Sequence, residues 1–387
     1  MTKAEALRAV AFDAYYEAEA GLGFAMFRMA GYAARRLVEE RFGIPADSVT
    51  ITHNGDWGYA LRSFKENDPT TYAQMNIYQE PRGVGYEPHT GREVRFGTAE
   101  VRSYVQSWSE PDLAAPRGVA LPASVETFGP EGRYGGVLLL EKQGLLPVVR
   151  AARIGERFDL MVAATQGQGV TAVKELIEEL AEAHPGVIVY LLHDFDVDGT
   201  SIAACLAGKD SKSWAWSVEA KVIDLGLALD HVRAYDVLDE SVSGKGDRVP
   251  LLRKNGCTEE AIGYLISEQR EEKGRILWTG RRAELNGLIG QRFIDFIEER
   301  LAEARCEKVV PDEDDVEAAY RRAVVIQRFN QEMERVVSSI ETDDVVPPPD
   351  LIKRVTDALQ AAPHKSWDWA VERIAAKHGG ALDGATL

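Results

Sequence analysis

The sequence predicts an α/β protein with a parallel-sheet domain, a smaller helical domain before it and a helical extension after it. Three observations predict this order. Helical spacing of apolar side chains fills the first 45 residues, three short apolar runs occupy the middle of the chain, and helical patterns return after an acidic linker. The domain boundaries that we expect from these changes are 1–130, 131–310 and 311–387.

The first domain combines helices with short β-rich pieces. Helical spacing covers residues 4–20 and 24–42, and Gly43 then supplies a common helix-ending signal. From 49 to 133 the pattern changes to short pieces between Gly, Pro and Asn, of which 101–108 is the longest with β character. Helices followed by short strands and turns favour a winged-helix-like domain with a β-rich connector.

The second domain alternates strands and helices. The apolar runs 137–140, 158–164 and 187–192 have the composition of buried parallel strands, and an amphipathic helix, 170–181, separates the last two. Strand, helix and strand in this order predict a parallel sheet with right-handed crossovers. Further helical stretches are expected at 282–303 and 316–340 and in a hairpin after the proline run 347–349.

Bulk composition limits the classes of function. The chain is 45% hydrophobic and 28% charged, which is typical of a globular protein. It has no apolar run of membrane-spanning length and no secretory signal pattern, so we expect a cytoplasmic protein. Three scattered cysteines exclude a disulfide framework and a zinc ribbon. A formal net charge of -17 predicts weak non-specific DNA binding, although it leaves room for a local DNA-binding groove.

Acidic residues follow two of the predicted strands. Glu141 comes directly after the first apolar run, and Asp194 and Asp196 lie two and four residues after the end of the third. Ligands of open α/β sheets gather at the carboxyl ends of strands, and alternate residues of an extended segment point the same way. An all-oxygen set of this kind suits Mg²⁺ and phosphate chemistry. An Asp after a strand also commonly caps the next helix, which is a competing role for one of them and for Asp198.

Three short patterns compete for these acids. An EF-hand loop is excluded because its twelfth position would be Cys205 and a strand precedes it. The first motif of haloacid-dehalogenase-type phosphatases would make Asp196 a nucleophile, but the strand should then run directly into that Asp, and His193 and Asp194 intervene. Residues 194–199 also resemble the motif of DHH-type phosphoesterases, which need a later Asp-His-His, and Asp230-His231-Val232 supplies only part of it.

A longer resemblance favours the Toprim domain, and specifically the A subunit of topoisomerase VI and its bacterial relatives. The segments that carry it, in the order of that family, are 78–83, 86–91, 138–144, 164–169, 193–199 and 281–286. The resemblance implies a Mg²⁺ site built from Glu141, Asp194 and Asp196. Gly167 and Gly169 lie in the glycine-rich turn, where backbone N–H groups before a helix can face an anion such as DNA phosphate.

The same resemblance implies a catalytic tyrosine in the first domain. Tyr32 stands four residues after Arg28, as the family's tyrosine follows its arginine, although Gly31 replaces the usual aromatic residue. Residues four apart share a helix face, so Arg28 could contact the phenol oxygen or the scissile phosphate. The implied protein is a type IIB topoisomerase A-subunit-like homodimer that breaks and rejoins double-stranded DNA through a phosphotyrosyl link. A GHKL-type ATPase B subunit would be its partner.

Two other functions are compatible with the same residues. A Toprim or DHH-type nuclease would use the metal site with water as nucleophile, and Tyr32 would then be structural. A non-catalytic DNA-binding or assembly module would use the acids to hold a structural ion. Formation of a covalent protein–DNA adduct distinguishes the topoisomerase from the nuclease, and DNA binding without cleavage distinguishes the third.

Overall fold

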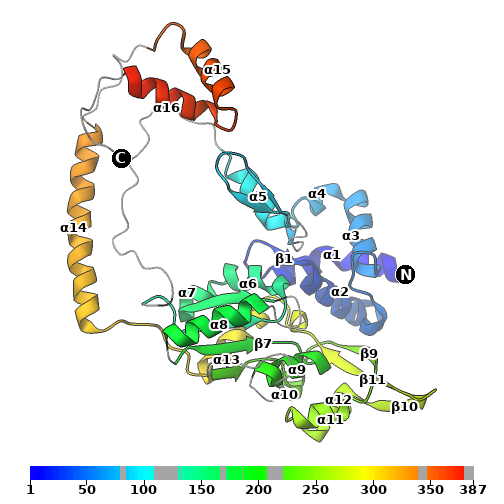
Figure 1. Ribbon diagram of the computed structural model, residues 1–387. Helices are drawn as coiled ribbons and strands as arrows, with labels where there is room; N and C mark the ends of the chain where they lie inside the picture. The colour runs from blue at the N-terminus through cyan, green and yellow to red at the C-terminus, as the bar shows by residue number, and fades with distance from the viewer. Residues whose placement is uncertain are drawn as a thin grey trace. The chain divides into compact units, whose positions relative to one another are not determined.

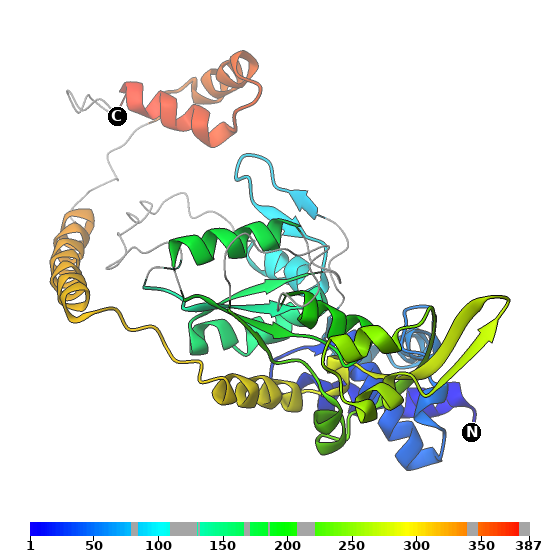
Figure 2. The ribbon, with the colours of Figure 1, turned by 60° about the horizontal axis from the view of Figure 1, so that its bottom comes forward.

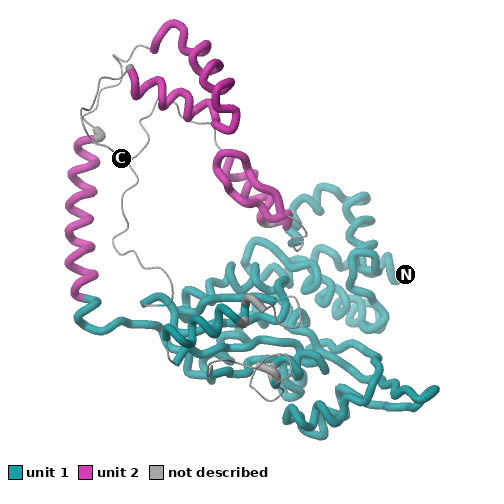
Figure 3. Tube along the Cα trace, viewed as in Figure 1, with its two compact units in different colours: residues 1–80, 126–316 teal, residues 81–125, 317–387 magenta. Residues whose placement is uncertain are grey.

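A computed structural model of the chain, shown in Figure 1 and, turned, in Figure 2, describes most of the sequence. The described residues are 1–78, 84–108, 130, 132–165, 171–184, 186–206, 221–338 and 347–378. They divide into two compact units (Figure 3): unit 1 is Met1–Glu80 with Glu126–Val316, and unit 2 is Pro81–Val125 with Glu317–Leu387. No helix among the described residues is both long and apolar enough to cross a membrane.

Unit 1 begins with a helical segment. Its elements are α1 (Lys3–Glu19), β1 (Ala25–Met26), α2 (Phe27–Phe42), η1 (Ala46–Ser48), α3 (Asp56–Asn67), α4 (Pro69–Tyr72) and β2 (Ile77–Tyr78). A capping box starts α1, because Thr2 and Glu5 each accept a hydrogen bond from the other's backbone N–H. Gly43 ends α2 in the left-handed conformation. The two predicted helices are therefore confirmed, while the winged-helix assignment stays a prediction.

A four-stranded parallel sheet forms the centre of unit 1. In spatial order its strands are β6 (Leu160–Ala164), β5 (Gly136–Leu140), β7 (Ile188–Leu192) and β8 (Lys221–Asp224). Leu140 pairs with both Ala164 and Leu192, so the three predicted strands end in register. The predicted parallel sheet is confirmed, and the residues after β5 and β7 meet at the same edge.

One face of this sheet is covered by α8 (Thr171–Ala183) and α9 (Val197–Leu206). Ile177 of α8 packs against Leu139, Val189 and Leu191, which are all almost fully buried. Each such side chain contributes about 1.5–3 kcal/mol by leaving water, so this packing stabilises β5 and β7 within the sheet.

A three-stranded antiparallel sheet also belongs to unit 1, in the order β10 (Glu268–Glu272), β11 (Arg275–Ala283) and β9 (Asp239–Lys245). A bridge between Phe195 and Ala283 joins the end of β11 to the segment after β7. The shorter elements around the two sheets are η2 (Gln143–Leu145), α6 (Leu146–Ala151), α7 (Ile154–Phe158), α10 (Leu229–Ala234), α11 (Val249–Lys254), α12 (Glu259–Leu265) and η3 (Leu285–Gly287). The helix predicted at 282–303 is corrected, because α13 (Gln291–Glu303) starts later and β11 occupies the first two positions.

Unit 2 contains a β-hairpin, β3 (Val84–Tyr86) with β4 (Glu93–Arg95), followed by α5 (Thr98–Gln106). It also contains most of α14 (Glu313–Ser338) and the hairpin of α15 (Leu351–Ala361) and α16 (Trp367–His378). The β character predicted for 101–108 is wrong. Val101 and Val105 lie one helical turn apart, and they belong to α5.

Candidate active site

Glu141 and Asp194 meet at the carboxyl ends of the two central strands. Glu141 follows β5, and its backbone N–H donates to the Leu192 carbonyl at the end of β7 (3.0 Å). The Asp194 backbone N–H in turn donates to Glu141 Oε2 (3.0 Å). Both residues are buried, with exposed fractions of 8% and 1%. The fold therefore brings together two acidic residues that lie far apart in the sequence.

Asp196 lies near Glu141 and also caps the helix that follows it. Its Oδ1 accepts a hydrogen bond from the Gly199 backbone N–H (2.6 Å) in the first turn of α9. A Cβ at Gly199 would lie 2.3 Å from the Asp194 carbonyl oxygen, so only glycine fits the turn without rearrangement. Asp198 is exposed to solvent.

Negative charge at this edge is only partly balanced. Burial raises the pKa of Glu141 to about 7, and the nearby Asp194 and Asp196 carboxylates add to the effect. Burial also raises the pKa of Asp194, although the Lys142 ammonium opposes that shift. Two buried acids whose charged forms are disfavoured would be stabilised by a cation.

Lys142 and Glu284 complete the surroundings of Asp194. The Lys142 ammonium forms ion pairs with Asp194 Oδ2 and with Glu284 Oε2, the second at 3.2 Å. The other carboxylate oxygen of Asp194 accepts a hydrogen bond from the Leu285 backbone N–H (2.8 Å). Both oxygens of Asp194 are thus engaged by groups of this chain.

The donor set fits Mg²⁺ in chemistry but is not gathered as a metal site. No group of three or more His, Cys, Asp or Glu side chains in the described part of the chain is placed to hold an ion. Asp194 contacts Lys142, and Asp196 caps α9. Three carboxylates with too little positive charge are nevertheless the ligand type that Mg²⁺ prefers. The Mg²⁺ prediction for Glu141, Asp194 and Asp196 stays a prediction.

Tyr32 lies in α2 and is fully buried. Its hydroxyl donates a hydrogen bond to Glu240 Oε1 (3.0 Å), and the same oxygen accepts from Arg35 (2.7 Å). Arg282 contacts the other oxygen of Glu240 at 2.8 Å. Burial, and then the carboxylates of Glu284 and Glu240, raise the pKa of Tyr32 well above its ordinary value. In this arrangement the phenol is protonated and shielded from solvent.

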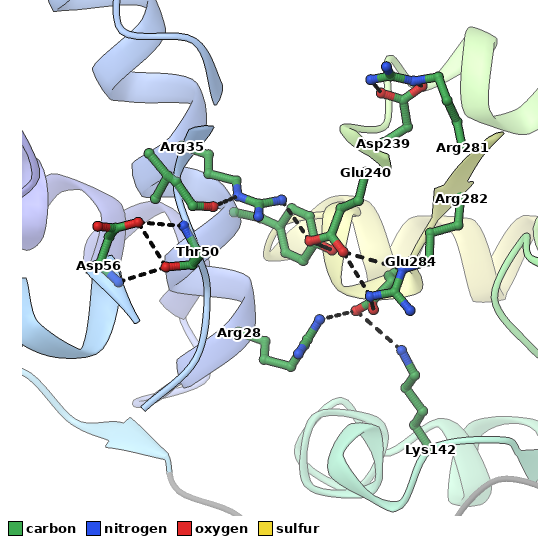
Figure 4. A network of polar contacts seen from close by, with 12 residues as sticks. Arg28, Arg35, Thr50, Asp56, Lys142, Asp239, Glu240, Arg281, Arg282 and Glu284 are labelled. Atoms are coloured by element: carbon green, nitrogen blue, oxygen red, sulfur yellow. Dashed lines mark hydrogen bonds and ion pairs between the residues drawn. The ribbon is translucent and has the colours of Figure 1, made fainter. Parts of the chain in front are cut away.

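Arg28 connects α2 to Glu284, which also faces Lys142 (Figure 4). Lys142 lies beside the acidic edge, the ends of β5 and β7 that carry Glu141 and Asp194. The Arg28 guanidinium forms an ion pair with Glu284 Oε2 (2.5 Å), the oxygen that also faces Lys142. Arg282 contacts Glu284 Oε1 at 3.0 Å. Burial alone would raise the pKa of Glu284, but the three cations Lys142, Arg28 and Arg282 lower it. The predicted pair of Arg28 and Tyr32 therefore belongs to one polar network with the end of β5.

Sequence reasoning missed Lys142, Glu240 and Glu284 as members of this network. A signal for Glu284 was present, because it is the one charged residue in the run 283–290. Buried charges of this kind are almost always paired. Glu240 carries no such signal, since it lies in a polar strand that alternates between partly buried and exposed residues.

His193, the first residue after β7, joins the end of β7 to the end of β8. Its Nδ1 faces the Asp194 carbonyl oxygen (2.7 Å), and its Nε2 faces Asp224 Oδ1 at the end of β8 (3.0 Å). Both neighbours are acceptors, so both ring nitrogens carry protons. Burial alone would lower the pKa of His193, but the Asp224 hydrogen bond and charge raise it to about 9. An imidazolium thus fixes the chain that carries Asp194.

Two other predictions concern residues away from this edge. Gly167 and Gly169, predicted to face DNA, lie outside the described residues. The partial DHH motif at Asp230 and His231 lies in α10, where His231 accepts from the Ala228 backbone N–H and packs edge-on against Phe296.

No known protein-family model matches the chain, and no curated protein matches it significantly. The functional assignment consequently depends on the residues and on their geometry.

Proposed function

We propose that this chain cleaves DNA phosphodiester bonds with Mg²⁺ bound by Glu141, Asp194 and Asp196. The observation that carries the proposal is the hydrogen bond from the Asp194 backbone N–H to the Glu141 carboxylate, which joins two buried acidic residues at neighbouring strand ends, where the pKa of Glu141 is raised to about 7. Two buried acidic residues destabilise a fold unless a cation neutralises their charge or a proton binds to one of them. Acids with perturbed pKa values are concentrated at functional sites. DNA as the substrate comes from the Toprim resemblance.

The bound ion would stabilise charge on the scissile phosphate and on the leaving oxygen. Glu141, Asp194 and Asp196 would hold it, and their strand-end positions would keep it fixed while the reaction proceeds. Arg28 is about one-third exposed and lies beside this edge, so its guanidinium can contact a phosphate oxygen. These residues account for binding and positioning without a nucleophile from the protein.

The surroundings of Tyr32 favour water as the nucleophile. Attack by a phenol requires loss of its proton and access to the phosphate, and the hydroxyl is buried and donated to Glu240. Glu240 is a poor base, because Arg282 and Arg35 outweigh the effect of its burial and lower its pKa. The nuclease is therefore the function that the site geometry supports best.

A type IIB topoisomerase is the second candidate, and one observation favours it. Arg28 lies one turn before Tyr32 and contacts Glu284, which faces Lys142 beside Glu141. The tyrosine helix is thus anchored at the acidic edge of its own chain. This function requires Tyr32 to leave Glu240, and it includes the proposed homodimer, duplex DNA and a GHKL-type ATPase partner.

One cleavage experiment tests the metal site. End-labelled duplex DNA is incubated with Mg²⁺ and with wild type, Asp194→Asn, Asp196→Asn or Asp198→Asn. We expect the first two variants to lose at least about 100-fold in rate, because each lacks a charged metal ligand. Asp198→Asn is the matched control and should cut at the wild-type rate. Wild-type rates in Asp194→Asn and Asp196→Asn would remove the site from consideration.

The same gels decide the nucleophile through Tyr32→Phe, which removes one oxygen and little volume. The nuclease predicts cleavage within about threefold of the wild-type rate and no protein attached to the DNA ends, because water and the metal remain. The topoisomerase predicts no cleavage by the variant and a covalent 5′ adduct with the wild type. Protein on the 5′ ends of wild-type reactions would overturn the nuclease assignment.

A further inference from the structure

We propose that Lys142 is the tethered counter-ion of Asp194 in the metal-free protein, and that the divalent ion must displace it to bind. This inference rests on the proposed metal site and adds to it a competing cation supplied by the chain itself. The observation is the ion pair between the Lys142 ammonium and Asp194 Oδ2.

The charges around Lys142 differ on its two sides. Glu284 has three cationic partners, Arg28, Arg282 and Lys142. Asp194, by contrast, has one cationic partner among the described residues, and that partner is Lys142. Removing Lys142 from Glu284 leaves that carboxylate paired, whereas removing it from Asp194 leaves a buried charge unpaired. Competition between the ammonium and a metal ion is therefore concentrated at Asp194.

Lys142 is able to make this exchange. Its side chain is 32% exposed, while the side chain of Asp194 is only 2% exposed. The acid is held in place by the Leu285 and Glu141 contacts, so the lysine is the partner that can swing away. Its second contact with Glu284 keeps the ammonium beside the acidic edge after the exchange. There it can contact a phosphate oxygen of bound DNA.

Metal binding without DNA tests the exchange. Lys142→Gln and Lys308→Gln each remove one positive charge, but Lys308 pairs with the distant Asp159 and is 60% exposed. Calorimetric titration with Mg²⁺, and with Ca²⁺ as a second probe, should give Lys142→Gln a Kd at least about tenfold lower than that of Lys308→Gln, which equals about 1.4 kcal/mol. Lys142→Arg keeps the charge and should bind as the wild type does. Equal or weaker binding by Lys142→Gln would overturn the proposal.

A second measurement uses the wild-type chain, so it does not depend on the variant folding. Acetylation of lysines by an amine-reactive ester is followed by mass spectrometry with and without Mg²⁺. Lys142 should be modified faster, by about threefold or more, when Mg²⁺ is present, because its ammonium is then released from Asp194. Lys308 serves as the internal reference. An unchanged Lys142 rate at saturating Mg²⁺ would contradict the exchange.

Asp194→Asn distinguishes the two ways in which these results could fail. Mg²⁺ binding that Asp194→Asn abolishes, together with no effect of Lys142→Gln, would overturn the lysine exchange and leave the proposed metal site intact. If Mg²⁺ binding does not depend on Asp194, or if the wild type does not bind Mg²⁺, the metal site and the exchange are overturned together.

Discussion

At the scale of single residues, Glu141 shows how position changes the chemistry of an ordinary carboxyl group. Its pKa is raised from 4.5 to about 7, so the folded protein binds this proton more tightly than the unfolded chain does. The folded state therefore loses stability as the pH rises from 4.5 to about 7, and the penalty is constant above that range. Without a metal ion, Glu141 opposes folding at neutral pH.

Glu141→Gln should remove this penalty, because the amide carbonyl can still accept the Asp194 N–H while carrying no charge. We expect the variant to match the wild type near pH 4.5 and to be more stable by about 3 kcal/mol above pH 7. Urea denaturation at several pH values with a chelator present measures the difference. The exposed Glu156→Gln is the control and should change little at any pH. A pH-independent effect of Glu141→Gln would contradict the prediction.

The sequence could locate Glu141 and Asp194 because each lies within two residues of the end of a recognisable apolar strand. It could not foresee the surroundings of Tyr32, because the hydroxyl contacts a residue 208 positions away. The spacing of Arg28 and Tyr32 correctly places both in one helix, yet spacing carries no information on burial. The pairing of Lys142 with Asp194 could not be foreseen for the same reason. The two residues meet only because β5 and β7 pair in the folded sheet.

At the scale of elements, prediction succeeded where one pattern was long or uniform. The three apolar runs became β5, β6 and β7, and the amphipathic pattern became α8, because each is buried on the faces that its period requires. The long helix expected from 316 is α14, which starts at Glu313.

Short elements with ambiguous periods were predicted wrongly. Val101 and Val105 fit both a strand face and a helix turn, and α5 forms instead of a strand. Arg282 was expected at a helix start, but the ion pairs of Arg281 with Asp239 and of Arg282 with Glu240 lie across the neighbouring strands β9 and β11. Cross-strand pairing between distant segments decided this element, and a local pattern cannot report it.

At the scale of the whole molecule, composition changes predicted a boundary near residue 130. The compact units follow another division, because Met1–Glu80 groups with Glu126–Val316. Partly buried ion pairs from α2 to the sheet-bearing segment, Arg35 with Glu240 and Arg28 with Glu284, contribute to this grouping. Such pairs require both segments to be in place, since separating them takes Arg28 away from Glu284 and Arg35 away from Glu240. We therefore expect unit 1 to unfold as one cooperative body.

Gly31 offers a test of that cooperativity, because it is confined by neighbours of the helical segment alone. A Cβ at this position would lie 2.3 Å from Ile51 Cγ2 and 3.0 Å from Trp57 Cδ1, which also explains why no aromatic residue precedes Tyr32. Gly31→Ala should destabilise the fold by about 1–3 kcal/mol through overpacking. At Gly263 in α12, an added Cβ would have no neighbour within 4 Å. Gly263→Ala should therefore stabilise the fold by about 0.5–1 kcal/mol.

Native-state hydrogen exchange then reports how far the damage spreads. In Gly31→Ala the amides of Val38 in α2 and of Val189 in β7, which are both fully buried, should lose the same free energy of protection. The physical reason is that the Arg28 and Arg35 ion pairs join α2 to the sheet-bearing segment, so α2 does not unfold while the sheet stays folded. Gly263→Ala should leave neither amide less protected. Loss of protection at Val38 with unchanged protection at Val189 would show that the helical segment unfolds separately, and that the predicted boundary near residue 130 describes the stability of the chain better than its contacts do.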